Sequence, residues 1–366
     1  MEIEEHFYTD DPSIGHPDVQ TRHPDTDYFF LGNGFIQAAV QISRSGEATP
    51  VGLLLMDPDR FGPKRAALTC DPESGLEDTM ISVRVGDSVF RPNPNEMKAE
   101  WEDRAGVPVV RVSWERGPIR VVERFFCPDH KQPRLAREVE VSLEEAGPGD
   151  PALGTIILEV ELASPSGNLS HTHQAGTVTA TLMHELRPQA YGEEGDEATG
   201  GSRTQVASWW AENRRPGQGI TDYWNRLTTF QTTDPGLNHL FQAARNHLPT
   251  AVDHRGRMDG SIWQYNLEWV RDQAHVAEAL VRLGHREKAG TMLARLLDQF
   301  VSPDGDTVDS GRRRSAADVE LDQNGELLAA LGTYVDWTGD LELVANRWEK
   351  IRALASFPFS DQFIHS

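Results

Sequence analysis

Cysteine is nearly absent from this chain, which contains only Cys70 and Cys127 among 366 residues. Two cysteines are too few for a disulfide framework, and their spacing is not that of a zinc knuckle. We therefore expect buried thiols in a reducing compartment, with neither a metal nor another cofactor.

Long apolar runs are also missing. No stretch of about 18 consecutive apolar residues occurs, and the N-terminal "MEIEEHFYTDD" lacks the basic and apolar regions of a signal peptide. These absences predict a soluble, cytoplasmic protein without a transmembrane helix.

Basic residues are few relative to acidic ones. Lys and Arg number 35 and Asp and Glu 57, which gives a formal net charge of −22. Such acidity argues against nucleic acid or an anionic membrane as the main partner. A neutral or cationic substrate fits this charge better.

Apolar residues alternate with polar ones in short runs up to about residue 230, separated by Gly, Pro, Asn and Asp. The clearest runs are 80–90, 107–126, 154–164 and 176–186. Alternation of this kind predicts antiparallel sheets packed as a β-sandwich, which we assign to residues 1–220. The polar, Gly-rich stretch from Arg187 to Thr221 is interpreted as a loop or linker.

The apolar period changes to 3.6 residues after Asp234, which indicates helices. The repeating apolar positions are Leu237, Leu240, Phe241, Ala244 and Leu248; Val276, Ala279, Leu280 and Leu283; Met292, Leu293, Leu296, Leu297 and Phe300; Leu327, Leu328, Leu331 and Val335; and Leu341, Val344, Trp348, Ile351 and Leu354. We predict a linker helix over 221–235 and five further helices over 236–366. Gly284 is expected to end the second helix, and Asp340 to cap the fifth.

One helix opens with an unusual group of side chains. Tyr265, Trp269, Arg271 and Asp272 lie within eight residues at its start. A sugar ring offers apolar C–H faces and a rim of hydroxyls, so its site needs aromatic platforms, an arginine donor and a carboxylate acceptor. A simpler alternative stays open, because an aspartate in a first helical turn is favoured by the helix dipole alone.

The same residues resemble a known family. "YNLEWVRD" (265–272) is similar to the Tyr-x-x-x-Trp-x-Arg-Asp segment of glucoamylases and bacterial glucodextranases, glycoside hydrolase family 15. "ELDQNGELLAALGTYVDWTGD" (320–340) resembles a later barrel helix of that family. "YFFLGNGFIQAAV" (28–40) resembles the first strand of the super-β-sandwich that precedes the barrel in bacterial members and in related disaccharide phosphorylases.

The resemblance implies a fold, a reaction and a set of roles. The fold would be a super-β-sandwich followed by an incomplete (α/α)6 toroid of six-hairpin type, and the reaction inverting hydrolysis of α-glucosidic bonds. Tyr265 would lie beside the scissile bond, Trp269 would wall the sugar site, and Arg271 with Asp272 would hold sugar hydroxyls. Asp322 and Glu326, four residues apart, would flank the same pocket; a solvated or capping pair is the alternative.

The resemblance also implies catalytic carboxylates that do not appear before Ser366, because the family's acid and base follow later helices. Glu349 falls within a periodic helix and is interpreted as an exposed residue. We therefore expect a fragment of a longer enzyme, prone to self-association through its incomplete barrel. A phosphorylase, or a non-catalytic carbohydrate-binding or scaffold protein, is the alternative.

Two weaker patterns invite metal binding. His171 and His173 share one face of a strand, but without a third ligand we expect a surface pair. The acidic stretch 302–309 lacks the spacing of an EF-hand and is predicted to be a turn.

Overall fold

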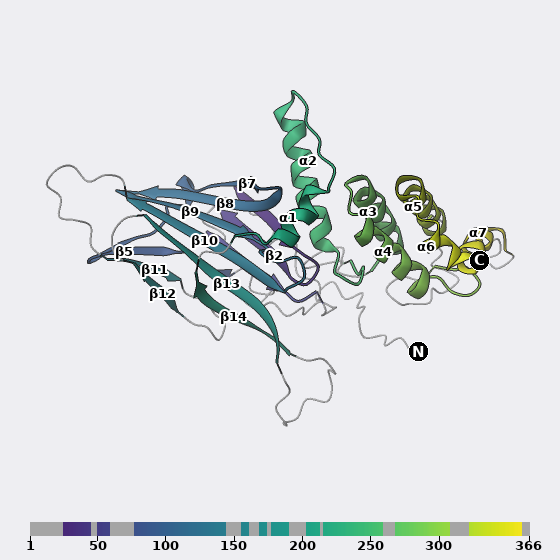
Figure 1. Ribbon diagram of the computed structural model, residues 1–366, viewed down its shortest axis with the longest axis horizontal. Coiled ribbons are helices and arrows are strands. Elements are labelled where there is room, and N and C mark those ends of the chain that lie inside the picture. The colour runs from purple at the N-terminus through teal and green to yellow at the C-terminus, as the bar shows by residue number, and fades with distance from the viewer. Residues whose placement is uncertain are drawn as a thin grey trace. The chain divides into compact units, whose positions relative to one another are not determined.

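The computed structural model describes residues 25–44, 50–58, 77–143, 155–160, 168–173, 177–189, 203–212, 215–258, 268–307 and 322–360. The chain divides between Asn225 and Arg226 into a β unit and a helical unit, inside the segment 221–235 expected to connect them. Antiparallel strands come first and helices follow, which confirms the expected order of fold classes (Figure 1).

Among its described residues, the β unit contains three antiparallel sheets. One sheet has the order β1-β2-β3-β4, with bounds Thr26–Gly32, Gln37–Ser43, Val51–Met56 and Glu77–Asp78. A second has the order β12-β11-β5-β6, with bounds Leu169–His173, Ile156–Val160, Ser82–Val85 and Ser88–Phe90. The largest has the order β14-β13-β10-β9-β8-β7, with bounds Arg203–Ala211, Val178–Gln189, Arg134–Leu143, Ile119–Phe126, Val107–Arg116 and Lys98–Arg104.

Period-two alternation places one face of the six-stranded sheet in the core. In β8, Val110, Val112 and Trp114 are buried, whereas the intervening Arg111 and Ser113 are partly exposed. Because successive side chains in a strand point to opposite faces, the buried set forms a single core face. The β-sandwich expected for this region is therefore confirmed.

The sandwich core also holds a buried ion pair. The Arg137 guanidinium lies 2.6 Å from a Glu123 carboxylate oxygen, both side chains are almost wholly inaccessible, and Arg137 also donates to the carbonyl of Thr79. Nearby, the fully buried ring of His184 hydrogen-bonds the Ser208 hydroxyl at 2.9 Å. Partners of this kind offset the cost of burying polar groups.

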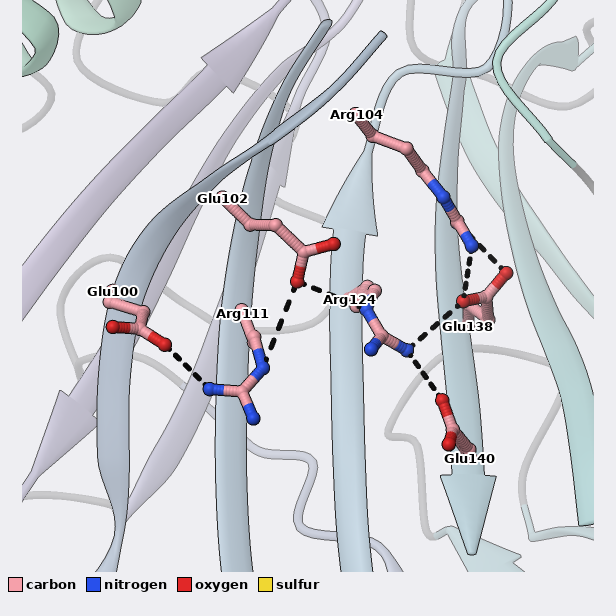
Figure 2. A network of polar contacts seen from close by, with 7 residues as sticks. All are labelled: Glu100, Glu102, Arg104, Arg111, Arg124, Glu138 and Glu140. Carbon is pink, nitrogen blue, oxygen red and sulfur yellow. Dashed lines mark hydrogen bonds and ion pairs between the residues drawn. The ribbon is translucent and has the colours of Figure 1, made fainter. Parts of the chain in front are cut away.

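The opposite face of the six-stranded sheet carries a network of charges (Figure 2). Arg124 on β9 donates to Glu102 on β7 at 3.1 Å and to Glu140 on β10 at 2.8 Å. Arg104 makes a two-pronged contact with Glu138, which also accepts from Arg124. Neighbouring strands thus present complementary charges across this face of the sheet, where Glu138 is almost fully buried.

Strand β14 corrects the sequence interpretation. Residues 203–211 lie in the stretch expected to be a loop, yet they pair with β13 along nine positions, from Arg203 against Gln189 to Ala211 against Thr181. The reason is packing: Val206 and Ser208 are buried, and the Arg187 guanidinium lies over the Trp209 ring at 5.3 Å. The polar composition of this stretch therefore obscured the pattern of an edge strand that buries only one face.

The helical unit contains six helices among its described residues. These are α2 (Pro235–His247), α3 (Val270–Arg282), α4 (Arg286–Gln299), α5 (Gln323–Thr338), α6 (Glu342–Ala345) and α7 (Trp348–Ser356), while α1 (Gln218–Asn225) belongs to the β unit. Short 3₁₀ turns follow α2 (Leu248–Ala251) and α7 (Phe357–Phe359), and another precedes β7 (Pro94–Glu96). The core of the helical unit lies between α3, α4, α5 and α7.

Turn residues end and cap these helices largely as the sequence predicts. Gly284 has φ +92°, a left-handed conformation that ends α3. Asp340 accepts hydrogen bonds from the N–H groups of Glu342 and Leu343, which confirms its capping role. The prediction of a single fifth helix was wrong, because Asn346 and Arg347 separate two helices, α6 and α7.

Apolar side chains of α2 lie at the surface. The helix has the predicted periodicity, but Leu237 and Leu240 are 49% and 65% exposed, and Asn246 is its only buried residue. Large exposed apolar side chains also occur from α5 to the C-terminal 3₁₀ turn: Trp337, Leu341, Trp348 and Phe359. The periodicity therefore predicted the helix correctly, but the helix does not bury its apolar face inside this unit.

Candidate functional site

Helices α3 and α5 pack against each other and run parallel, because Arg271 and His275 of α3 contact residues 322 and 326 of α5 in the same order. Arg271 Nη1 donates to Asp322 Oδ2 at 3.4 Å, and His275 Nε2 lies 3.2 Å from Glu326 Oε1. Both pairs join residues 51 positions apart, one helical turn after the other. The two helices therefore bring two cations or donors and two carboxylates to one place.

The N-cap residues of α3 and α5 do not cap these helices with a side-chain hydrogen bond. Trp269, at the N-cap of α3, has no side-chain acceptor, and Asp322, at the N-cap of α5, makes no capping hydrogen bond. The Asp322 carboxylate contacts Arg271 instead. In contrast, Asp234 caps α2 by accepting from Gly236 and Leu237. The N-terminus of a helix carries partial positive charge, which favours an oxygen-bearing ligand.

A buried ion pair fixes the segment that precedes α3. Glu268 receives two hydrogen bonds from Arg295 on α4, at 2.9 and 2.8 Å, and its carboxylate also lies 4.0 Å from Arg257. Burial holds the pKa of Arg257 below its usual value, partly offset by Glu268 and Asp253. A two-pronged contact of this kind restricts orientation, so Glu268 positions the adjacent Trp269.

Of the residues predicted from sequence to bind substrate, the structure brings two into contact. Arg271 and Asp322 form one pair, with side chains 36% and 48% exposed. Glu326 lies one turn further along α5, and its partner is His275, which the sequence interpretation did not include. Trp269, two residues before Arg271 in the chain, is partly exposed.

The other two residues predicted to bind substrate are Asp272 and Tyr265. Asp272 is exposed in the first turn of α3, and neither an ion pair nor a hydrogen bond links its carboxylate to another described residue. Successive residues lie about 100° apart around an α-helix, so Asp272 lies to one side of the face of α3 that carries Arg271. Tyr265 lies outside the described residues, and its role stays a prediction.

An internal repeat supports both helices, and sequence reasoning missed it. The stretches from Val252 to Met258 and from Val301 to Thr307 each close with an isolated β-bridge. Each contains a glycine with positive φ, Gly256 at +78° and Gly305 at +95°, seated against a later helix backbone. One turn precedes α3 and the other precedes α5.

A shared Asp-Gln pair at the helix starts was the signal for this repeat. It occurs as Asp272-Gln273 and again as Asp322-Gln323, and both glutamines are fully buried. The amide of Gln273 has no hydrogen-bond partner among the described residues. Asn324, next in α5, donates to the carbonyls of Gly305 and Leu354, so the first turn of α5 is tied to the repeated turn before it.

The two weaker metal patterns concern His171 with His173 and the acidic stretch 302–309. Within the described residues, no cluster of three or more His, Cys, Asp or Glu side chains is arranged to hold a metal ion. Residues 302–306 form the predicted turn, closed by a hydrogen bond from the Ser302 N–H to the Asp306 carbonyl. Cys127 is buried, as expected, and burial raises its pKa to about 12; Cys70 lies outside the described residues.

Two further expectations concern helices. Glu349 lies in α7, 76% exposed and paired with Arg352, which confirms an exposed helix residue. Among the described helices, none combines the length and the apolar character needed to cross a bilayer.

Comparisons with known proteins give little support for any one family. No family pattern and no curated protein matches the chain. A solved structure described as "Putative kojibiose phosphorylase from human microbiome" is similar at 9% sequence identity and a TM-score of 0.38, over 98% of this chain. The chain spans 57% of the length of that protein. None of these comparisons places the chain in the glucoamylase family.

Proposed function

We propose that the chain is part of a carbohydrate-active enzyme that cleaves glycosidic bonds, and that the aligned starts of α3 and α5 bind its sugar. The contact between Arg271 and Asp322 carries this proposal. It sets a guanidinium and a carboxylate side by side on separate helices, and the partly exposed Trp269 lies two residues before Arg271 in the chain.

The exposure of this pair favours a binding role over a structural one. An ion pair with side chains 36% and 48% exposed contributes only about 0 to 1 kcal/mol to folding. The same groups suit a sugar, because the guanidinium donates to ring or hydroxyl oxygens and the carboxylate accepts from hydroxyls. Trp269 would cover an apolar face of the ring.

Glu326 and His275 extend the polar surface by one helical turn. The Glu326 side chain is 24% exposed, and its Oε2 atom is buried without a hydrogen-bond partner among the described residues. A bound hydroxyl donating to this oxygen would satisfy it after a small side-chain rotation. Asp272, exposed in the neighbouring turn, is proposed to contact a sugar hydroxyl at the rim.

The reaction is proposed to be bond cleavage by water, as in glucoamylases, with phosphate in place of water as the alternative. The residues described here bind sugar in either case, and none of them is assigned as general acid or base. Inverting hydrolysis would need two further carboxyl groups, one to protonate the leaving oxygen and one to activate water. Self-association through the exposed apolar side chains stays a prediction.

Replacing Arg271 with Leu tests the site. We expect affinity for maltose or acarbose to fall by about 2 to 3 kcal/mol, the cost of losing a charged hydrogen-bond donor, measured by calorimetric titration of the full chain. The melting temperature should stay almost unchanged, since the pair is exposed.

Arg282→Leu is the matched control. Arg282 lies at the other end of α3, half-exposed and paired with Glu278, so its loss should leave binding intact. Equal affinities for the parent chain and Arg271→Leu would remove Arg271 from the site.

A further inference from the structure

We propose a second saccharide-binding site on the β unit, in a cavity of about 590 Å³ at the open edge of the sandwich. It is lined by His171, Thr179, Ala180, Trp210, Ala211 and Glu212. The choice of a saccharide rests on the proposed function, whereas the cavity and its side chains stand independently of it.

The cavity lies where two sheets end. β12 is the edge strand of the four-stranded sheet that it shares with β11, and β14 is the edge strand of the six-stranded sheet. These two edge strands approach each other, and His171 on β12 lies with its ring centroid 5.3 Å from that of Trp210 on β14, at 38°. The edge of the sandwich is therefore closed by two rings, both partly exposed.

The lining suits one face and the rim of a sugar ring. An indole is an apolar platform for C–H groups, while the exposed Thr179 and Glu212 offer a hydroxyl and a carboxylate to sugar hydroxyls. The cavity volume lies within the range of about 300 to 1,000 Å³ that is usual for small-molecule sites.

His171 contributes as a neutral group. Burial, and to a smaller extent the nearby His173, lower the pKa of His171 below its ordinary value. A neutral imidazole both donates and accepts, which matches a hydroxyl rim better than an anion. Because His171 and His173 lack a third ligand among the described residues, a metal ion fits this edge less well.

Fluorine NMR of the full chain labelled with 5-fluorotryptophan tests the site. The resonance of Trp210, assigned with Trp210→Phe, should shift and saturate during a maltose titration. Trp209 is the matched control, because it points to the opposite face of β14 and packs under Arg187. Its resonance should not move.

Two variants separate this site from the helical one. Glu212→Ala should weaken the response of Trp210 about tenfold, since a charged acceptor is lost at an exposed position. Arg271→Leu should leave that response unchanged, so failure of the helical site alone would not remove the second one. The proposal is overturned if Trp210 does not respond to maltose, if Trp209 shifts equally, or if tetramethylammonium shifts Trp210 while maltose does not.

Discussion

Burial decides which ionic contacts of this protein hold its structure and which are available for binding. The pair of Glu268 and Arg295 is 6% and 15% exposed, whereas Arg271 and Asp322 are several times more exposed. The resemblance to sugar-binding segments assigned Arg271 and Asp322 to one pocket, without predicting a contact between them. The sequence could not predict the buried pair, because residues 27 positions apart on different elements meet only through tertiary packing.

Glu268→Gln should destabilise the helical unit by about 3 kcal/mol, because it leaves the buried Arg295 guanidinium without a charged partner. Chemical denaturation monitored by circular dichroism measures this change. Asp298→Asn is the control, since Asp298 makes a similar two-pronged contact with Arg347 at the surface and should cost under about 1 kcal/mol. Equal losses of unfolding free energy in the two variants would show that Glu268 stabilises the helical unit no more than Asp298 does.

Helices were easier to derive from the sequence than the turns that connect them. The 3.6-residue period located α2, α3, α4 and α5, because an amphipathic pattern is a property of the helix itself. The repeated turns before α3 and α5 went unnoticed, since a glycine in each turn and the Asp-Gln pair at each helix start are a short signal. The edge strand β14 was missed because its polar side chains hide one buried face.

Gly305 tests the packing of the second repeated turn. It has φ +95°, and an added Cβ would come within 2.2 Å of the Ala353 carbonyl oxygen in α7. Gly305→Ala should therefore cost several kcal/mol by thermal unfolding, through backbone strain and overpacking together.

Gly339 provides the comparison. It also has positive φ, +70°, but an added Cβ would meet nothing within 4 Å. Gly339→Ala should cost only about 1 kcal/mol. If the two substitutions cost the same, the contact between the turn and α7 contributes nothing.

At the scale of the molecule, the sequence predicted strands followed by helices but not the candidate site in full. The change of period near residue 230 reflects which side chains can be buried, and it marked both units. The site depends on how α3 and α5 align, which no local pattern specifies. Only the resemblance placed Arg271 and Asp322 in one pocket.

Buried histidines predict how the stability of both units depends on pH. Burial lowers the pKa of His184 in the β unit and of His285 in the helical unit to about 3. Both rings are neutral when folded, so their contribution is fully present above pH 6.5 and is lost as the pH falls from 6.5 toward 3. Each loss amounts to roughly 5 kcal/mol over that range.

Unfolding free energies measured by urea titration between pH 7 and pH 4 would show this slope. The slope of unfolding free energy against pH reports the number of protons taken up on unfolding. His184→Asn should lower that number by about one, because one titrating ring is removed. A slope that does not change with this substitution would contradict a neutral, buried His184.

The central claim is that sugar binds at the aligned starts of α3 and α5, and hydrogen–deuterium exchange of the full chain with and without acarbose tests it most directly. Binding should slow exchange of the backbone amides from Trp269 to Gln273 and from Asp322 to Glu326, and Arg271→Leu should abolish that protection. Unchanged exchange in both first turns, at acarbose concentrations that give a calorimetric signal, would contradict the account.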